Sequence, residues 1–219
     1  ALVERLVVLQ YADQYTFVGN VTLLEQACLD LSSKPPDRIY VDVDEGPQKM
    51  LMPPLLQTYL TNDLLSGLRS ARLTSAPSLL NFPQMPRFMV SLSGWLLGYP
   101  VVYVTGEAKD KGESISESDN PSIVNTLNNI PLTLFRVTAS YDASRFSKRP
   151  LHDPSVAPFR KPSVELMSFS CPTALLSHDE KTQVCQTLAS AIRLAIAAQA
   201  DLFDAHVAES QVVLPHVAL

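Results

Sequence analysis

The sequence predicts a mixed α/β fold: a single mixed β-sheet with an antiparallel part, and helices packed on it. Two observations lead to this prediction. Short runs rich in Val, Ile, Tyr and Phe, typical of strands, are interspersed with segments whose apolar residues recur every three or four positions, typical of amphipathic helices. Some strands are joined by tight turns, which give antiparallel neighbours, and others by long connections, which allow parallel ones.

Length and composition fit one globular domain. The chain has 219 residues, of which 46% are hydrophobic and 18% are charged, so it can bury a sizeable core. Its net charge of -5 argues against a general nucleic-acid binder, which needs clustered Lys and Arg. No run reaches the roughly 18 to 20 apolar residues of a membrane span. We therefore expect a soluble protein that binds neither nucleic acid nor membrane; its oligomeric state stays open.

The cysteines indicate the compartment. Cys28, Cys171 and Cys185 cannot all pair with one another, and no CxxC motif is present. This usage favours a reducing compartment, the cytoplasm or the nucleus. The apolar opening of the chain is interrupted by Glu4 and Arg5, which makes it a poor signal peptide.

Turn residues bound the expected strands. The first two strands form a hairpin with its turn at Asp13 and Gln14, and Gly46 and Pro47 end the next strand. The expected strands cover residues 6–18 (both arms of the hairpin), 38–44, 88–92, 101–105, 132–140, 164–170 and 211–214.

Capping patterns mark two of the expected helices. Thr22 with Glu25, and Ser177 with Glu180, have the spacing of a capping box, in which two side chains satisfy each other's backbone donors. A third, short helix is closed by Gly98. The expected helices cover residues 23–31, 53–73, 95–98 and 179–203.

Two long polar segments are expected to be exposed loops. Residues 106–129 are rich in Ser, Asn, Asp and Glu, and residues 142–162 carry basic residues among four prolines. If the three strands around these loops form an antiparallel meander, the loops leave opposite ends of the sheet. The basic loop has the composition of a peptide or nucleic-acid contact, but simple solvation is the favoured interpretation.

Several short stretches together resemble one family. They are residues 40–43 (YVDV), 96–100 (LLGYP), 135–137 (FRV), 168–170 (SFS) followed by Pro172, 213–215 (VLP) and 217–219 (VAL). As a set they are similar to an uncharacterised eukaryotic family, a domain of unknown function whose human member is named only as a chromosome 1 open reading frame. The resemblance implies a further strand–helix unit ahead of Ala1, so that this chain would be a fragment. It implies no catalytic residue, cofactor or partner.

The acidic residues Asp42 and Asp44 are the strongest candidates for chemistry. Alternate side chains of a strand share a face, so these two carboxylates, with Glu45 beside them, could hold Mg²⁺ for phosphoester chemistry. The alternative is a solvated acidic turn in which Asp44 stabilises the bend before Gly46. We favour the turn, and predict no metal and no cofactor.

Arg136 is the second candidate, because it stands in an otherwise apolar strand. A buried charge without a partner is very costly, so this guanidinium needs a counter-ion. We expect it to pair with Asp42 in a structural ion pair; the alternative is that it binds an anionic ligand.

Four further residues are weaker ligand-binding candidates. Tyr99 and Tyr103 would ring a cleft that contains the acidic residues, and Ser168 and Ser170 share one face of their strand. The sequence contains no HExxH, GxSxG, GxGxxG or P-loop pattern, so standard zinc, serine-hydrolase and nucleotide sites are not expected.

Two functional hypotheses follow. The leading one is a non-enzymatic binding or scaffold domain that acts through protein contacts, because the sequence shows no complete catalytic set. The rival is an enzyme whose cleft uses Asp42, Asp44 and Arg136 on a phosphate-bearing or other anionic substrate. A shared cavity around Asp42 and Arg136 would favour the enzyme.

Overall fold

The structure is a computed structural model of the chain. It describes residues 6–31, 33, 38–44, 46–73, 77–106, 126–141, 163–197, 202–215 and 217. Most of the two predicted loops, residues 106–129 and 142–162, falls outside these ranges, as does Glu45. The predictions for those residues therefore lie outside the described structure.

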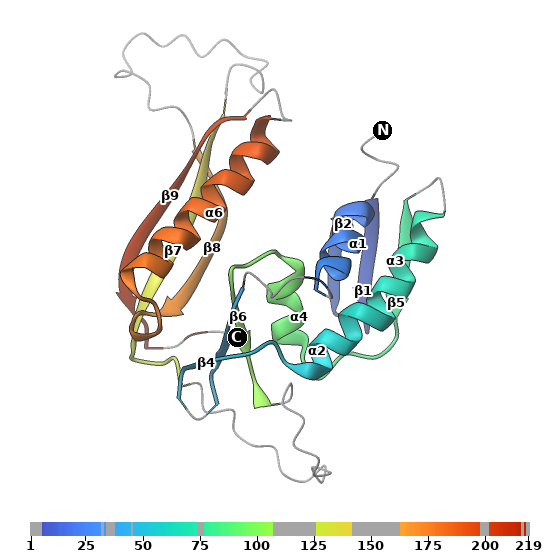
Figure 1. The fold of residues 1–219 in the computed structure, drawn as a ribbon, viewed down its shortest axis with the longest axis horizontal. Coiled ribbons are helices and arrows are strands. Elements are labelled where there is room, and N and C mark those ends of the chain that lie inside the picture. Colours follow the sequence, from blue (N-terminus) through green and yellow to red (C-terminus); the bar gives the residue numbers. More distant parts are fainter. Residues whose placement is uncertain are drawn as a thin grey trace. The chain divides into compact units, whose positions relative to one another are not determined.

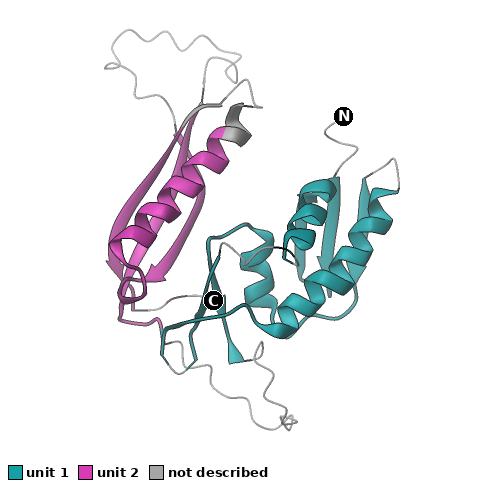
Figure 2. Cartoon of the chain, viewed as in Figure 1, with its two compact units in different colours: residues 1–126, 218–219 teal, residues 127–217 magenta. Residues whose placement is uncertain are grey.

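The chain divides into two compact units, shown in teal and magenta in Figure 2. Unit 1 comprises residues 1–126 and 218–219, and unit 2 comprises residues 127–217. Within the described ranges the strands form three sheets of three strands each. The mixed α/β class is confirmed, and the prediction of a single sheet is wrong. That the whole chain is one domain stays a prediction, because two compact units can unfold together or separately.

The first sheet of unit 1 has the order β2-β1-β5. Strand β1 (Leu6–Tyr11) pairs antiparallel with β2 (Tyr15–Asn20) and parallel with β5 (Ser78–Phe82). The predicted hairpin is confirmed, and both Ala12 and Asp13 in its turn have positive φ, at 47° and 57°. Strand β5 is not among the strands expected from the sequence, and Pro77 and Pro83 flank it. As the edge strand of this sheet it ends where Pro83 begins, a place that tolerates proline.

The second sheet of unit 1 has the order β4-β3-β6. Strand β3 (Ile39–Asp42) pairs antiparallel with β4 (Gln48–Met50) and parallel with β6 (Val101–Val104). Strands β3 and β6 were both predicted. The sequence left open a meander of β6 with the two strands that follow it; within unit 1, β6 pairs with β3.

One long helical rod dominates unit 1 (Figure 1). It consists of α2 (Pro54–Tyr59), a π-helical turn η2 (Leu60–Leu64) and α3 (Leu65–Arg72), which confirms the predicted helix of residues 53–73. Its buried leucines recur every four residues, so one face of the rod enters the core. These fully buried residues are Leu56, Leu60, Leu64 and Leu68.

Two shorter helices complete unit 1. Helix α1 (Val21–Asp30) was predicted with a capping box, but its cap is Asn20, whose Oδ1 accepts hydrogen bonds from the N–H groups of Thr22 and Leu23. Helix α4 (Met89–Leu96) replaces the strand predicted at residues 88–92. Its buried residues Met89, Leu92 and Trp95 recur every three positions, a helical period that a five-residue window is too short to reveal.

Unit 1 has a core built from its own elements. Side chains from β1, α1, β3, the helical rod, α4 and β6 form a single buried cluster. The helical rod lies close to β5 at Gly67, where an added Cβ would approach Leu80 to 3.1 Å. This close approach brings the middle of β5 next to α3.

Unit 2 contains the third sheet, which is antiparallel throughout, with the order β8-β7-β9. Its strands are β7 (Pro131–Tyr141), β8 (Ser163–Pro172) and β9 (Leu202–Val213). Strands β7 and β8 are antiparallel neighbours, as expected. Strand β9 begins where the predicted helix 179–203 should have ended and is far longer than the predicted strand 211–214, so both of those boundaries are wrong.

Helix α6 (His178–Ala197) lies along one face of this sheet (Figure 1). Its predicted capping box is confirmed: the backbone N–H of Ser177 donates to Glu180 Oε2 at 2.9 Å, and the N–H of Glu180 donates to Ser177 Oγ at 3.2 Å. Val184 and Leu188 are buried against the sheet. Neither α6 nor any other helix in the described part of the chain is long and apolar enough to cross a membrane.

Candidate functional site

The carboxylate of Asp42 is held in a local turn. Its Oδ1 accepts from the N–H of Asp44 at 3.0 Å, and its Oδ2 accepts from Gln48 Nε2 at 3.3 Å. Asp42 is buried and stabilises the turn after β3, the role that we had expected of Asp44. Asp44 lies beside Gly106, where an added Cβ would meet its Oδ2 at 2.8 Å. The described residues contain no group of three or more His, Cys, Asp or Glu side chains suited to a metal ion.

Arg136 lies in β7 of unit 2, whereas its predicted partner Asp42 lies in unit 1. The ion pair between them stays a prediction. Phe135 and Val137 are buried, and Arg136 points to the opposite face because alternate side chains of a strand do so. Its Nε contacts Glu165 Oε2 at 2.9 Å, and both side chains are about half exposed. The expectation of a buried arginine is therefore wrong.

The four weaker candidates are divided between the two units. Tyr99 follows α4, and its N–H donates to the carbonyl of Gly94, while Tyr103 lies half-buried in β6. Ser168 and Ser170 lie half-buried in β8 of unit 2. Ligand binding by these residues stays a prediction.

A groove not foreseen from the sequence lies in unit 1, beside the π-helical turn. It has a volume of about 660 Å³. Its apolar lining comes from the end of α2, the end of β5 and the connection to α4, and consists of Tyr59, Phe82, Pro83, Met85, Pro86 and Phe88. Its polar lining comes from the helical rod and that connection, and consists of Asn62, Asp63, Ser66 and Gln84. We refer to it as the aromatic groove.

Stacked rings fix the shape of the aromatic groove. The ring of Phe82 stacks on Tyr11 with centroids 4.7 Å apart, and Tyr59 packs against Phe82 and Phe88 at 6.0 and 5.5 Å. The hydroxyl of Tyr59 donates to that of Tyr11 at 3.0 Å. Aromatic pairs in such offset and edge arrangements add stability beyond their buried area, so these walls are preformed.

The electrostatics of the aromatic groove are simple. Burial, reinforced by the hydrogen bond to Tyr11 and by the charge of Asp63, raises the pKa of Tyr59 far above its usual range, so this phenol stays protonated. Of the described residues that line the groove, Asp63 is the one with a charged side chain, and it is exposed. It belongs to the π-helical turn, a feature that occurs frequently at functional sites.

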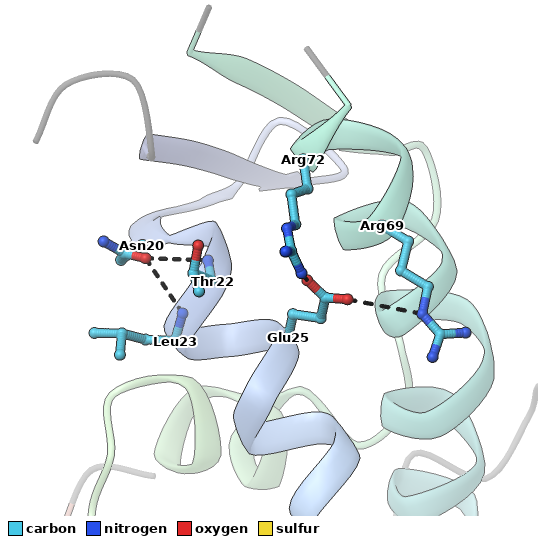
Figure 3. A network of polar contacts seen from close by, with 6 residues as sticks. All are labelled: Asn20, Thr22, Leu23, Glu25, Arg69 and Arg72. Carbon is cyan, nitrogen blue, oxygen red and sulfur yellow. Dashed lines mark hydrogen bonds and ion pairs between the residues drawn. The ribbon is translucent and has the colours of Figure 1, made fainter. Parts of the chain in front are cut away.

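A second, polar pocket of about 570 Å³ lies further along the helical rod. Its charged residues are Glu25 of α1 with Arg69 and Arg72 of α3. Figure 3 shows the Glu25 carboxylate between the two guanidinium groups: Arg72 Nη1 lies 2.8 Å from Oε2, and Arg69 Nε lies 3.8 Å from Oε1. We refer to it as the arginine pocket.

The aromatic groove and the arginine pocket adjoin each other. Asn62 and Ser66 line both of them. Tyr59, Asn62, Ser66 and Arg69 follow one another at intervals of three or four residues, so they lie along one side of the helical rod. The aromatic groove and the arginine pocket therefore lie next to each other on this side of the rod.

The aromatic groove and the arginine pocket could hardly be foreseen from the sequence. The helical spacing of residues 53–73 predicts the rod, but it does not mark the polar side of the rod as a site. The dense run of Phe82, Pro83, Met85, Pro86 and Phe88 was the available signal. Such clusters of rings, prolines and methionine between two elements are unusual for a plain connection.

Comparison with known proteins identifies the family. The model of the family described as "Domain of unknown function (DUF4504)" matches residues 1–219, so the chain belongs to this family. No curated protein and no solved structure gives a significant match.

Proposed function

We propose that this member of the DUF4504 family is a non-enzymatic protein-interaction domain whose aromatic groove holds a short segment of a partner protein. The observation that supports the proposal is the lining of the groove: its described residues include aromatic rings, prolines and a methionine, together with the carboxylate of Asp63. Preformed apolar pockets with a few placed polar groups are the usual form of binding sites.

The lining defines the occupant. Aromatic rings and Met85 favour an apolar side chain, and methionine adapts to different shapes. Asp63, next to the ring of Tyr59, favours a Lys or Arg beside that apolar residue, since a cation gains from both the carboxylate and the ring face. The expected ligand is therefore an apolar residue adjacent to a basic one.

Binding without catalysis fits the ionisation of the site. The phenol of Tyr59 stays protonated, and the described lining pairs no nucleophile with a base. The rival proposal, an enzyme acting on an anionic substrate through Asp42, Asp44 and Arg136, has less support because Arg136 is engaged by Glu165. An intracellular, soluble setting is part of our proposal and is supported by Cys28, a buried cysteine that forms no disulfide.

The test uses a random library of synthetic peptides, each about twelve residues long, applied to the immobilised chain. We expect the retained peptides to be enriched in an apolar residue next to Lys or Arg, with affinities of about 1 to 100 μM by fluorescence anisotropy. Asp63→Asn should weaken the binding of the basic peptides about three- to tenfold, because the groove loses the negative charge of this carboxylate. Asp13→Asn, which removes an exposed carboxylate in the hairpin turn, is the matched control and should change nothing.

A blocking variant locates the binding. Ser66→Trp places a large side chain in the groove from an exposed helix position and should reduce affinity at least about tenfold. Gln57→Trp makes the same kind of change at an exposed position of the same rod that does not line the groove, and should have no effect. The proposal fails if the library shows no enrichment, or if Ser66→Trp binds the retained peptides as well as the wild type does.

A further inference from the structure

The arginine pocket lies where a segment leaving the aromatic groove would pass. The two sites share Asn62 and Ser66. Tyr59 and Arg69 are ten positions apart, and a helix rises about 1.5 Å per residue, so they are roughly 15 Å apart along the rod. An extended peptide advances about 3.3 Å per residue. A residue about four or five positions from the apolar anchor would therefore lie at the arginines.

Glu25 orients both arginines without consuming their hydrogen-bonding capacity. Its side chain is 10% exposed, whereas those of Arg69 and Arg72 are each 59% exposed. A guanidinium carries five N–H donors, and Glu25 faces Nη1 of Arg72 and Nε of Arg69, so several donors of each remain directed to solvent. The Glu25 carboxylate thus acts as an anchor that holds the two guanidinium groups at the surface.

The pocket keeps a positive surplus. Two guanidinium charges stand against one carboxylate charge and the partial negative charge, roughly half a unit, at the C-terminal end of α3. The hydroxyls of Thr61 and Ser70 bond to carbonyls of their own helix, so the arginines supply the charge that a ligand would meet. An oxyanion fits this environment, because planar guanidinium groups bind carboxylate and phosphate oxygens in pairs.

We propose that the arginine pocket binds an acidic residue of the same partner segment, about four or five residues from the apolar residue in the aromatic groove. A phosphorylated serine or threonine is the favoured acidic residue, because it carries nearly two charges and three acceptor oxygens. This proposal rests on the proposed function, and it makes binding dependent on the charge state of the partner.

The experiment compares three versions of the tightest peptide from the library, with Ser, Glu or phosphoserine at the fourth or fifth position from the apolar residue. We expect the phosphoserine peptide to bind about tenfold more tightly than the Ser peptide, with the Glu peptide between them. Arg69→Gln should remove this preference. Arg69 is chosen because Arg72 makes the short contact that secures Glu25. The matched control is Arg193→Gln, an exposed arginine of unit 2.

Each outcome decides one of the two proposals. Equal binding of the three peptides overturns the arginine-pocket proposal and leaves the groove proposal standing. An acid preference that survives in Arg69→Gln also overturns it, because the acid is then bound elsewhere. A library without any retained peptide overturns the groove proposal, and the present one with it.

Discussion

At the scale of single residues, Glu25 shows that a sequence spacing can predict the wrong role for a carboxylate. It stands three positions after Thr22, as in a capping box, but Asn20 caps the helix and Glu25 turns to Arg69 and Arg72. The helix begins at Val21, two positions before the predicted start at residue 23. The capping side chain, Asn20, likewise lies two positions before Thr22.

We predict that Glu25→Gln destabilises the protein by about 1 to 2 kcal/mol, because two arginines lose their partner while water still screens their exposed charges. Urea unfolding at neutral pH measures the change. Glu165→Gln removes the partner of Arg136 at a half-exposed site and should cost less than about 1 kcal/mol. Equal costs for the two variants would contradict the role of Glu25 as an anchor.

A second prediction concerns alkaline pH. Burial raises the pKa of Cys28 from 9.0 to about 12, and the pKa values of Tyr11 and Tyr40 from 10.0 to about 12. Above pH 9 the unfolded chain therefore loses protons that the native state keeps. The contribution of these three groups to stability should be constant well below pH 9 and should fall as the pH rises toward 12.

Urea midpoints measured from pH 7 to pH 11 test this prediction. The midpoint should decline above pH 9, and Cys28→Ala should reduce the first part of the decline, because that thiol has the lowest unfolded-state pKa of the three groups. A midpoint that rises with pH in this interval would show that the sign of our argument is wrong.

At the scale of elements, the β1–β2 hairpin offers a stabilising change. Ala12 has a φ of 47°, in the left-handed region where a Cβ is strained. Ala12→Gly should raise stability by about 0.5 to 1 kcal/mol, because glycine adopts this conformation freely, whereas Ala12→Val should lower it. Thermal unfolding of the wild type, Ala12→Gly and Ala12→Val measures the order of their melting temperatures. A lower melting temperature for Ala12→Gly would mean that this turn conformation is not strained.

The elements also show what the sequence could predict. Regular signals led to correct elements: the rod of residues 53–73, the capping box at Ser177 and the left-handed Gly98 were all found. Short apolar runs did not lead to correct elements. Residues 88–92 are compatible with either a strand or a helix, and in the structure most of them belong to α4. Which strands pair with each other could not be predicted from the sequence either, because pairing such as that of β3 with β6 depends on tertiary packing.

At the scale of the whole molecule, the candidate site could not be predicted because it is assembled from distant segments. Its two sides, residues 59–66 and 82–88, meet because β5 pairs with β1 and the rod packs over β5 at Gly67. The sequence candidates Asp42 and Arg136 were conspicuous for their charge, but each is engaged within its own unit. Charge in an apolar stretch marks a residue that needs a partner, and that partner is more often structural than catalytic.

The division into two units leads to the last prediction, which concerns cooperativity. The core of unit 1 consists of residues of that unit, and in unit 2 the cluster around Ile192 joins β7, α6 and β9. A cavity in one core should therefore destabilise that unit alone. Leu188→Ala removes a buried side chain of α6 and should cost unit 2 about 2 to 5 kcal/mol.

The single tryptophan of the chain makes this prediction measurable. Trp95 lies in the core of unit 1, so its fluorescence reports the unfolding of that unit, while far-UV circular dichroism reports both units. In Leu188→Ala we expect the dichroism to show an earlier transition while the fluorescence midpoint stays within error of the wild type. Leu60→Ala, in the core of unit 1, is the reciprocal variant and should shift the fluorescence. If Leu188→Ala shifts both signals together, the units unfold as one domain, because only coupled cores transmit the loss.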